Sequence, residues 1–267
     1  MTTIDPPLKA RDTYHLWVQT WRDSSAALLD AIDLRPGSIC ADIGCGGEGI
    51  LPLLHRRVGE GGCVIGVDCD GDALTAAARL CTTQALTSVR LIQEDVLHST
   101  LPRDVFDLVH ARFLLSSLLR PERGVQMMVD LARPGGVVAL QEIDHAGWSI
   151  DPQPALWPSL RALLAAGHGL RGDPNIGRRL GELLCTAELE AVTVRPVVLI
   201  LYNRHPFMRA AVRGMADVHQ QSVHAGLATV PELDALLAEV DCALDDPRTT
   251  MTTFTVVQAW GRKPARR

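Results

Sequence analysis

The chain has 267 residues, a length that fits one α/β domain with insertions better than two full domains. The chain has 47% apolar residues, 21% charged residues and a net charge of −5. This composition excludes a fibrous or disordered protein. The longest aliphatic run, 197–201, is far below the roughly 20 residues that a membrane helix needs. The first residues lack the basic-then-apolar pattern of a signal peptide, so we expect a cytoplasmic protein with no membrane partner.

Composition also argues against a nucleic-acid partner and a metal site. Aromatic residues make up only 4% of the chain, and the low net charge lacks the broad positive field of a nucleic-acid binder. The 7 cysteines are odd in number and contain no CxxC pair. We therefore expect reduced cysteines, no zinc site and no bound metal.

The first half of the chain alternates between strands and helices. A helix is predicted over 12–33, ending at the turn 35–37. Strands are predicted at 39–43, 63–67, 89–93, 105–109 and 137–142, and helices at 50–57, 72–82 and 114–131. This alternation predicts a mostly parallel sheet with helices on both of its faces.

The second half of the chain does not continue this alternation of strands and helices. Two helices separated by the turn 172–174 are predicted within 144–190, followed by a β-rich stretch at 192–201. A helical segment with a capping box at Thr229 and Glu232 comes next, and a strand at 254–260 ends the pattern. We expect one domain with these parts: a helical cover (1–36), a cofactor-binding core (37–143), helical lid insertions (144–190 and 204–250) and final strands (191–203 and 252–261).

A glycine-rich loop follows the first predicted strand. Gly44, Gly46 and Gly49 satisfy the pattern GxGxxG between a strand and a helix, where glycines allow a tight turn and a close approach of backbone N–H groups to a ligand. Asp68 comes at the carboxyl end of the next strand, where a carboxylate can accept hydrogen bonds from two ribose hydroxyls. Together these residues predict a site for a nucleoside cofactor.

Further residues help to choose the cofactor. Asp42 would put a carboxylate beside the glycine loop, which is unfavourable for a pyrophosphate and suitable for a cationic cofactor. Asp95 can accept from an adenine amino group while Val96 packs on the ring. The turn 133–136, Arg-Pro-Gly-Gly, precedes the fifth strand.

With these motifs the chain resembles the class I S-adenosylmethionine-dependent methyltransferases, in particular the small-molecule enzymes of the ubiquinone/menaquinone-biosynthesis-like type. The residues that carry the resemblance are 41–49, 66–68, 94–96, 106–112 and 133–136. The resemblance implies a Rossmann-like sheet of seven mostly parallel strands whose last strand is antiparallel. It also implies S-adenosylmethionine as cofactor, S-adenosylhomocysteine as product and no metal.

The resemblance further implies roles for single residues. Gly44 and Gly46 would lie against the methionine part of the cofactor, and Asp68 would bind the ribose. The residues expected to contact the cofactor are Tyr14, Asp42, Gly44, Cys45, Gly46, Asp68, Cys69, Asp95, Val96, His110 and Ala111. Related sequences often have a histidine where this chain has Ser117, so no catalytic histidine is assigned to that segment.

Methyl transfer from a sulfonium asks mainly for proximity and orientation, and needs a general base only if the acceptor must lose a proton. His145, Glu142 and His110 are the candidates for a direct catalytic role. Two alternatives stay open at this stage: His145 as the partner of a backbone carbonyl or a solvated turn residue, and Glu142 as a hydrogen-bonded carboxylate that shapes the site.

An excess of arginine marks the candidate lid. Between 161 and 213 there are eight arginines and four acidic residues, and paired guanidiniums bind carboxylates or phosphates well. Arg112, Trp148, Arg178 and Arg179 are the predicted contacts of the acceptor. The alternatives are a solvated helical face for the arginines and a core position for Trp148 with Trp157.

The function predicted from the sequence is methylation of a small organic acceptor, at oxygen, in specialised metabolism. A small-molecule substrate is the only partner expected. Two alternatives remain: an NAD-dependent oxidoreductase, supported only by GxGxxG and Asp68, and a cofactor-binding protein of the same fold without methyl transfer.

Overall fold

The computed structural model describes residues 10–265, apart from the side chains of 10–12, 216 and 217. The chain divides into two compact units. The sheet unit comprises Ser24–Ala146, Arg171–Val198 and residues 254–265. The helical unit comprises residues 10–23 together with Gly147–Leu170 and Leu199–Thr253. The single-domain organisation with lid insertions stays a prediction.

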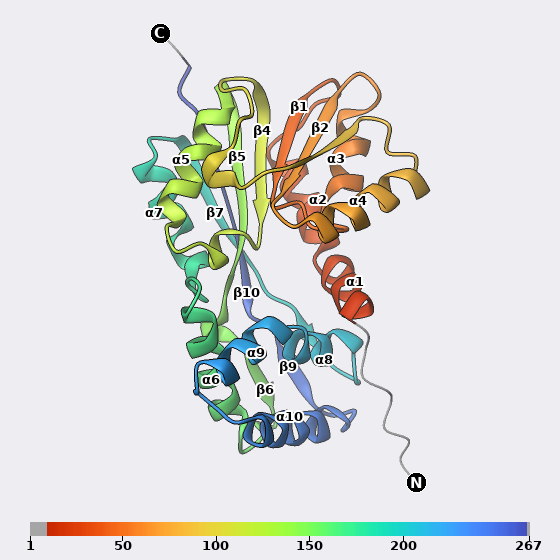
Figure 1. Ribbon diagram of the computed structural model, residues 1–267, viewed down its shortest axis with the longest axis vertical. Helices are drawn as coiled ribbons and strands as arrows, with labels where there is room; N and C mark the ends of the chain where they lie inside the picture. The colour runs from red at the N-terminus through yellow and green to blue at the C-terminus, as the bar shows by residue number, and fades with distance from the viewer. Residues whose placement is uncertain (1–9, 266–267) are drawn as a thin grey trace. The chain divides into compact units, whose positions relative to one another are not determined.

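The sheet unit is built on seven strands in the order β3-β2-β1-β4-β5-β10-β7 (Figure 1). Strands β1 to β5 are parallel where they pair, and β10 is antiparallel to both β5 and β7. Their bounds are β1 Ile39–Ile43, β2 Cys63–Asp68, β3 Val89–Gln93, β4 Phe106–Arg112, β5 Ala132–Asp144, β7 Glu190–Val197 and β10 Thr255–Arg262. The predicted Rossmann-like sheet with an antiparallel last strand is confirmed.

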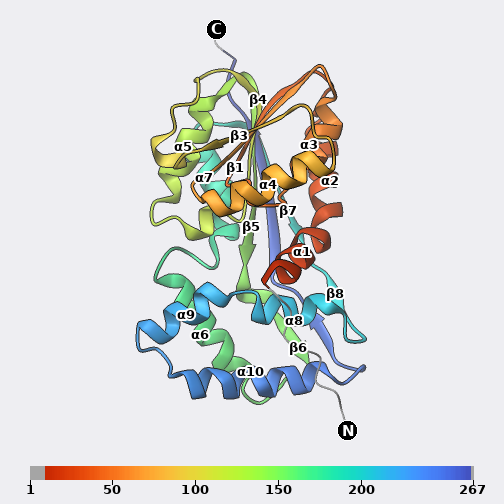
Figure 2. The ribbon, with the colours of Figure 1, turned by 45° about the vertical axis from the view of Figure 1, so that its right-hand side comes forward.

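Helices cover both faces of this sheet, as Figure 2 shows. Side chains alternate between faces along a strand, so Leu108 packs in the core on one side and Val109 in the core on the other. The first face is covered by α2 (Arg22–Ala31), α3 (Leu51–Val58) and α4 (Gly71–Thr83), and the second by α5 (Pro121–Leu131) and α7 (Leu180–Thr186). The two buried layers fix which strand residues face which helix.

Two predicted helices are divided in the structure. The helix expected over 114–131 is a 3₁₀ turn, η2 (Leu115–Ser117), followed by α5, which begins at Pro121 because proline suits the first turn of a helix and disrupts its interior. The helix expected over 12–33 is α1 (Ala10–Thr20) and α2, because most of α2 belongs to the sheet unit while α1 packs on α8 of the helical unit.

Several strands are longer than predicted. β4 continues to Arg112, so 110–112 belong to the strand, and β5 begins at Ala132 rather than 137. The remaining short helices of the chain are η1 (Val96–His98), η3 (His145–Gly147) and η4 (Ile176–Arg179).

The helical unit combines helices with a small sheet. Its helices are α1, α6 (Trp157–Gly169), α8 (Pro206–Arg213), α9 (Ala216–His224) and α10 (Val230–Leu244). The sheet is antiparallel, in the order β6 (Ser149–Asp151), β9 (Thr250–Thr252), β8 (Ile200–Leu201), and was not predicted. The capping box of Thr229 and Glu232 at the start of α10 is confirmed.

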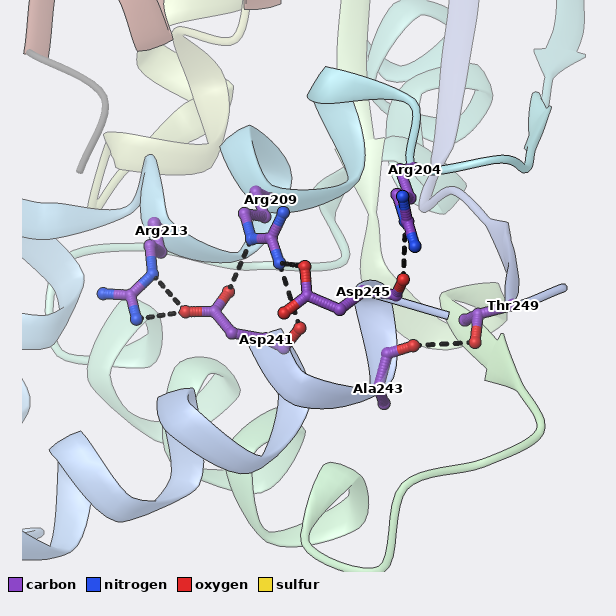
Figure 3. Close-up of polar contacts among 7 residues, drawn as sticks. All are labelled: Arg204, Arg209, Arg213, Asp241, Ala243, Asp245 and Thr249. Atoms are coloured by element: carbon purple, nitrogen blue, oxygen red, sulfur yellow. Dashed lines mark hydrogen bonds and ion pairs between the residues drawn. The ribbon is translucent and has the colours of Figure 1, made fainter. Parts of the chain in front are cut away.

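Ion pairs join α8 to α10 inside the helical unit (Figure 3). Arg213 forms an ion pair with Asp241, and Arg209 bridges Asp241 and Asp245, with Arg209 Nη2 2.5 Å from Asp245 Oδ1. Arg204 Nε, just before α8, donates to the carbonyl of Asp245 at 2.6 Å. These arginines therefore have partners within the protein.

The chain segment around Gly172 packs closely on the turn η2. A Cβ on Gly172 would lie 2.0 Å from the carbonyl oxygen of Ser116, a distance that backbone atoms cannot accommodate. Asp173 N also donates to Ser116 O at 3.1 Å. The absence of a side chain at 172 thus lets this segment lie against η2, the turn that follows β4.

We predict that Gly172→Ala lowers the free energy of unfolding by about 1–3 kcal/mol, because the added methyl group overpacks this contact. The matched control is Gly169→Ala, where a Cβ meets no atom within 4 Å and no loss is expected. Urea unfolding of both variants measures the difference. Equal stability of the two variants would contradict the packing described here.

Candidate functional site

The glycine loop after β1 is tied to the end of β2. Gly44 and Gly46 have φ values of 68° and 62°, a conformation that favours glycine. The amides of Gly44 and Cys45 donate to the carbonyl of Val67 at 2.8 and 3.0 Å, and Gly46 N donates to Asp68 Oδ2 at 2.9 Å. The loop and the acidic residue at the end of β2 therefore form one hydrogen-bonded unit.

Asp68 is half-buried and accepts two backbone N–H groups. Besides Gly46 N it receives Asp70 N at Oδ1, at 3.0 Å. A carboxylate has about four lone-pair sites, so capacity remains for hydroxyl donors.

Two cysteines predicted to contact the cofactor neighbour these residues: Cys69 is exposed and Cys45 is buried. Burial, and after it the nearby Asp42, raises the pKa of the Cys45 thiol, which is a neutral packing group.

Asp95 and Val96 follow β3 at the same edge of the sheet. Asp95 Oδ1 accepts Leu97 N at 2.9 Å and begins η1, and this hydrogen bond lowers the pKa of the exposed Asp95 carboxyl. Val96 is buried, with a 6% exposed fraction. Because the carboxyl ends of parallel strands meet at one edge, the glycine loop, Asp68 and Asp95 stand in a row.

Asp42 and His110 form a buried pair on adjacent strands. They are register partners on β1 and β4, and Asp42 Oδ1 lies 2.7 Å from His110 Nδ1. The side chain of His110 has no exposed surface, and its Nε2 lies 2.9 Å from Gln141 Nε2. Ala111, the next residue, is buried on the opposite face. Both ring nitrogens of His110 are thus engaged within the sheet, and a direct contact of His110 with cofactor or acceptor stays a prediction.

Glu142 holds the turn that follows β4. Its carboxylate is fully buried and accepts Leu115 N at 2.6 Å and Ser116 N at 3.3 Å. Burial raises its pKa to about 7, although the backbone donors act in the opposite direction. These contacts fit the alternative of a carboxylate that shapes the site, and a direct catalytic role stays a prediction.

The segment after β5 places the other predicted contacts. Arg178 binds the Asp144 carboxylate with two hydrogen bonds, at 2.7 and 2.8 Å, and Arg179 Nη2 lies 2.8 Å from Glu122 Oε1. The backbone N–H of His145 donates to Asn175 Oδ1 at 3.0 Å, and its ring packs on Phe254 at a centroid distance of 5.6 Å. Both arginines thus have carboxylate partners within the sheet unit.

The remaining predicted contacts lie in different places. Arg112 ends β4, where its guanidinium donates to Ser25 Oγ at 3.3 Å and lies over the Phe113 ring. Trp148 is buried in the helical unit and packs edge-to-face on Trp157, with the ring centroids 5.0 Å apart. This position fits the alternative of a core residue. Tyr14 lies on α1 with 41% of its surface exposed. The binding roles predicted for these three residues stay predictions.

Sequence reasoning missed three residues at this edge. Phe113, directly after β4, has a φ of 59°, which is rare for a bulky residue and often marks functional sites, but no sequence signal reports it. Gln141 and Gln258 are fully buried. Their signal is present in the sequence, as single polar residues at inward-facing positions of apolar strands.

A concavity lies at the amino edge of the strands, opposite to the edge that carries the glycine loop. It is lined by residues 32–38 and by Asp107, Arg133 and Arg262, among others. Arg133 Nε is paired with Asp107 Oδ1 at 2.7 Å. Because ligands of open α/β sheets bind outside the carboxyl ends of the strands, this concavity is not the candidate site.

Among residues 10–265, no group of three or more His, Cys, Asp or Glu side chains is arranged to hold a metal ion. None of the helices in that range is long and apolar enough to cross a membrane.

Comparison with known proteins agrees with this geometry. A family model described as a methyltransferase domain matches residues 41–140. The nocamycin O-methyltransferase of Saccharothrix syringae is 29% identical over 82% of this chain and 74% of its own length. An uncharacterised 37.1 kDa protein in a transposon of Streptomyces fradiae is 28% identical over 81% of this chain, and the match spans 63% of that protein.

Solved structures share the fold. Phosphoethanolamine N-methyltransferase 2 of Haemonchus contortus, in complex with phosphomonomethylethanolamine and S-adenosylhomocysteine, has a TM-score of 0.61 at 15% identity, covering 97% of this chain and 59% of that protein. The strand order and this likeness show the Rossmann-like fold of methyltransferases, and residues 41–140 carry the methyltransferase domain that the family model describes.

The raised pKa of Glu142 predicts a pH-dependent contribution to stability. A carboxyl whose pKa is about 7 when folded and near 4.5 when unfolded contributes stability that is complete below pH 4.5 and lost as the pH rises through 7. The difference in unfolding free energy between wild type and Glu142→Gln should therefore fall between about pH 4.5 and 7, at up to about 1.4 kcal/mol per pH unit. Urea unfolding at several pH values measures this, and a constant difference would contradict the assignment.

Proposed function

We propose that this protein transfers the methyl group of S-adenosylmethionine to an oxygen atom of a small organic acceptor in specialised metabolism. The observation that carries the proposal is the row formed by the glycine loop, Asp68 and Asp95 at the carboxyl edge of the sheet. The nocamycin O-methyltransferase relative supports oxygen as the methylated atom and a small molecule as the substrate.

The chain's own residues account for cofactor binding. Gly44 and Gly46, which lack side chains, leave room for the methionine part beside the loop. Asp68 accepts the ribose hydroxyls at its remaining lone pairs, and Asp95 accepts from the adenine amino group above the buried Val96. Asp42, at the base of the loop, supplies negative charge for a cationic ligand.

The reaction then needs few protein groups. When bound, S-adenosylmethionine supplies a methyl carbon that its sulfonium activates for in-line displacement. The protein holds the acceptor oxygen in line at about 3 Å and excludes water. Among the three candidate bases, His110 and Glu142 have no exposed surface, so His145, with 6% exposed, is the base we propose for an acceptor that must lose a proton.

The alternative of an NAD-dependent oxidoreductase has no further support. It required a pyrophosphate at the glycine loop, and the buried Asp42 carboxylate at the base of this loop opposes such an anion. The other alternative, cofactor binding without methyl transfer, differs in product formation and is decided by experiment.

Calorimetric titration tests the cofactor site. We predict that wild type binds S-adenosylmethionine and S-adenosylhomocysteine, and that Asp68→Asn raises both dissociation constants roughly tenfold or more, because a hydrogen bond to a charged group contributes about 1.5–3 kcal/mol. Glu60→Gln, exposed at the amino edge, removes the same charge and should leave both constants unchanged. Binding of neither compound by wild type would refute the proposal.

Product analysis tests the transfer step. With a panel of hydroxylated acceptors, mass spectrometry should detect a mass gain of one methylene group with wild type, and a much lower rate with His145→Asn at unchanged cofactor affinity. Cofactor binding with no methylated product across the panel would favour the alternative of a binding protein. Full activity of His145→Asn would exclude His145 as the base.

A further inference from the structure

A row of polar side chains crosses the interior of the sheet. Asp42 on β1, His110 on β4, Gln141 on β5 and Gln258 on β10 are each at most 2% exposed. Gln141 and Gln258 are register partners, and Gln258 is the partner of the half-buried Arg195 on β7. All lie in the sheet unit, on five consecutive strands of its order (Figure 1).

Hydrogen bonds connect every neighbour in this row. Arg195 Nε and Nη2 donate to Gln258 Oε1 at 3.0 and 2.5 Å. Gln258 Nε2 donates to Gln141 Oε1 at 2.8 Å. Gln141 Nε2 lies 2.9 Å from His110 Nε2, and His110 Nδ1 lies 2.7 Å from Asp42 Oδ1. The contacts form an unbroken chain from a guanidinium to a carboxylate.

Arg195 determines the donor-to-acceptor direction of the hydrogen bonds in this row. A guanidinium can only donate, so the atom of Gln258 that faces Arg195 must be its oxygen. The amide nitrogen of Gln258 then faces the backbone carbonyl of Ser24, at 2.9 Å, and a carbonyl can only accept. Gln258 therefore has one allowed orientation, fixed independently by a donor and by an acceptor.

The orientation of Gln258 fixes the orientation of Gln141 and, through it, which nitrogen of the His110 ring is protonated. Gln258 Nε2 requires an acceptor in Gln141, so Oε1 of Gln141 faces it, and Ser25 Oγ donates to the same oxygen at 3.1 Å. Gln141 Nε2 must then donate to His110 Nε2. An accepting Nε2 carries no proton, so the proton of the neutral ring is on Nδ1 and is donated to Asp42.

We propose that Gln141, Gln258 and Arg195 are positioning residues that hold His110 as its neutral Nδ1–H tautomer and, through it, aim the Asp42 carboxylate at the glycine loop. The second oxygen, Asp42 Oδ2, faces Gly49, where a Cβ would lie 3.6 Å from it. Because His110 is neutral, the pair keeps the full negative charge of Asp42. Such a charge favours a sulfonium over a thioether. This last consequence rests on the proposed function, whereas the tautomer does not.

Nitrogen NMR of the cofactor-free protein tests the tautomer. With ¹⁵N-labelled histidine, the signals of His110 among the nine histidines are identified by their loss in His110→Asn. In wild type, Nδ1 should have the shift of a protonated ring nitrogen and Nε2 that of an unprotonated one. An Nε2–H tautomer, or an imidazolium at neutral pH, in wild type would overturn the proposal.

Gln141→Glu tests the dependence on the row. The change keeps the size of the side chain but replaces the donor that faces His110 Nε2 by a carboxylate oxygen, so the ring should become an imidazolium with both nitrogens protonated. Gln84→Glu, at the exposed end of α4, adds the same charge and should leave the His110 spectrum unchanged. A neutral Nδ1–H ring in Gln141→Glu would overturn the proposal.

Calorimetry separates this proposal from the proposed function. In Gln141→Glu the imidazolium offsets the charge of Asp42, while the added carboxylate lies at the other ring nitrogen, on the side away from Asp42. The negative charge therefore moves away from the glycine loop, and the preference for S-adenosylmethionine over S-adenosylhomocysteine should fall about tenfold in Gln141→Glu and not in Gln84→Glu. An altered tautomer with an unchanged preference would overturn the role of the row in cofactor binding. If wild type shows the Nδ1–H tautomer but binds neither compound, the proposed function fails and the positioning of Asp42 stands.

Discussion

The hydrogen bond from the amide of Gly46 to the carboxylate of Asp68 links two strand ends on which the candidate site depends. It requires that the chain turn sharply after β1, which the positive φ angles of Gly44 and Gly46 provide. It also requires β1 and β2 to be parallel and adjacent, so that both end at the same edge. With those conditions met, Asp95 at the end of β3 joins the same row, and the proposed cofactor site has carboxylates and backbone N–H groups along one edge of the sheet.

The interior of the sheet has to tolerate several buried polar groups near that edge. Asp42, His110, Gln141 and Gln258 all face the α2 side, where an unpaired polar group would cost several kcal/mol. Each is paired with a neighbour, and Ser25 of α2 adds a donor from above the sheet. Glu142 is a separate case on β5, because its partners are the backbone amides of the turn after β4. Polar satisfaction and the shape of the site are therefore determined together.

The sequence predicted much of the sheet unit because its signals are local. Gly44, Gly46 and Asp68 occur at strand ends, and the strand β3 was predicted with its observed bounds, Val89–Gln93. Prediction was poorer where tertiary packing determines the secondary structure. The break between α1 and α2 lies close to the boundary between the two units. The small sheet β6-β9-β8 pairs strands that are about 50 to 100 residues apart in the sequence. The backbone of Phe113 and the partners of Gln258 depend on the assembled sheet, and no local pattern reports them.

The central claim is that the carboxyl edge between the glycine loop and Asp95 is the cofactor site. A crystal structure of the protein with S-adenosylhomocysteine tests this most directly. The account predicts the ribose hydroxyls within hydrogen-bonding distance of the Asp68 carboxylate and the adenine beside Asp95 and Val96. S-adenosylhomocysteine bound elsewhere, or a ribose that makes no contact with Asp68, would contradict it.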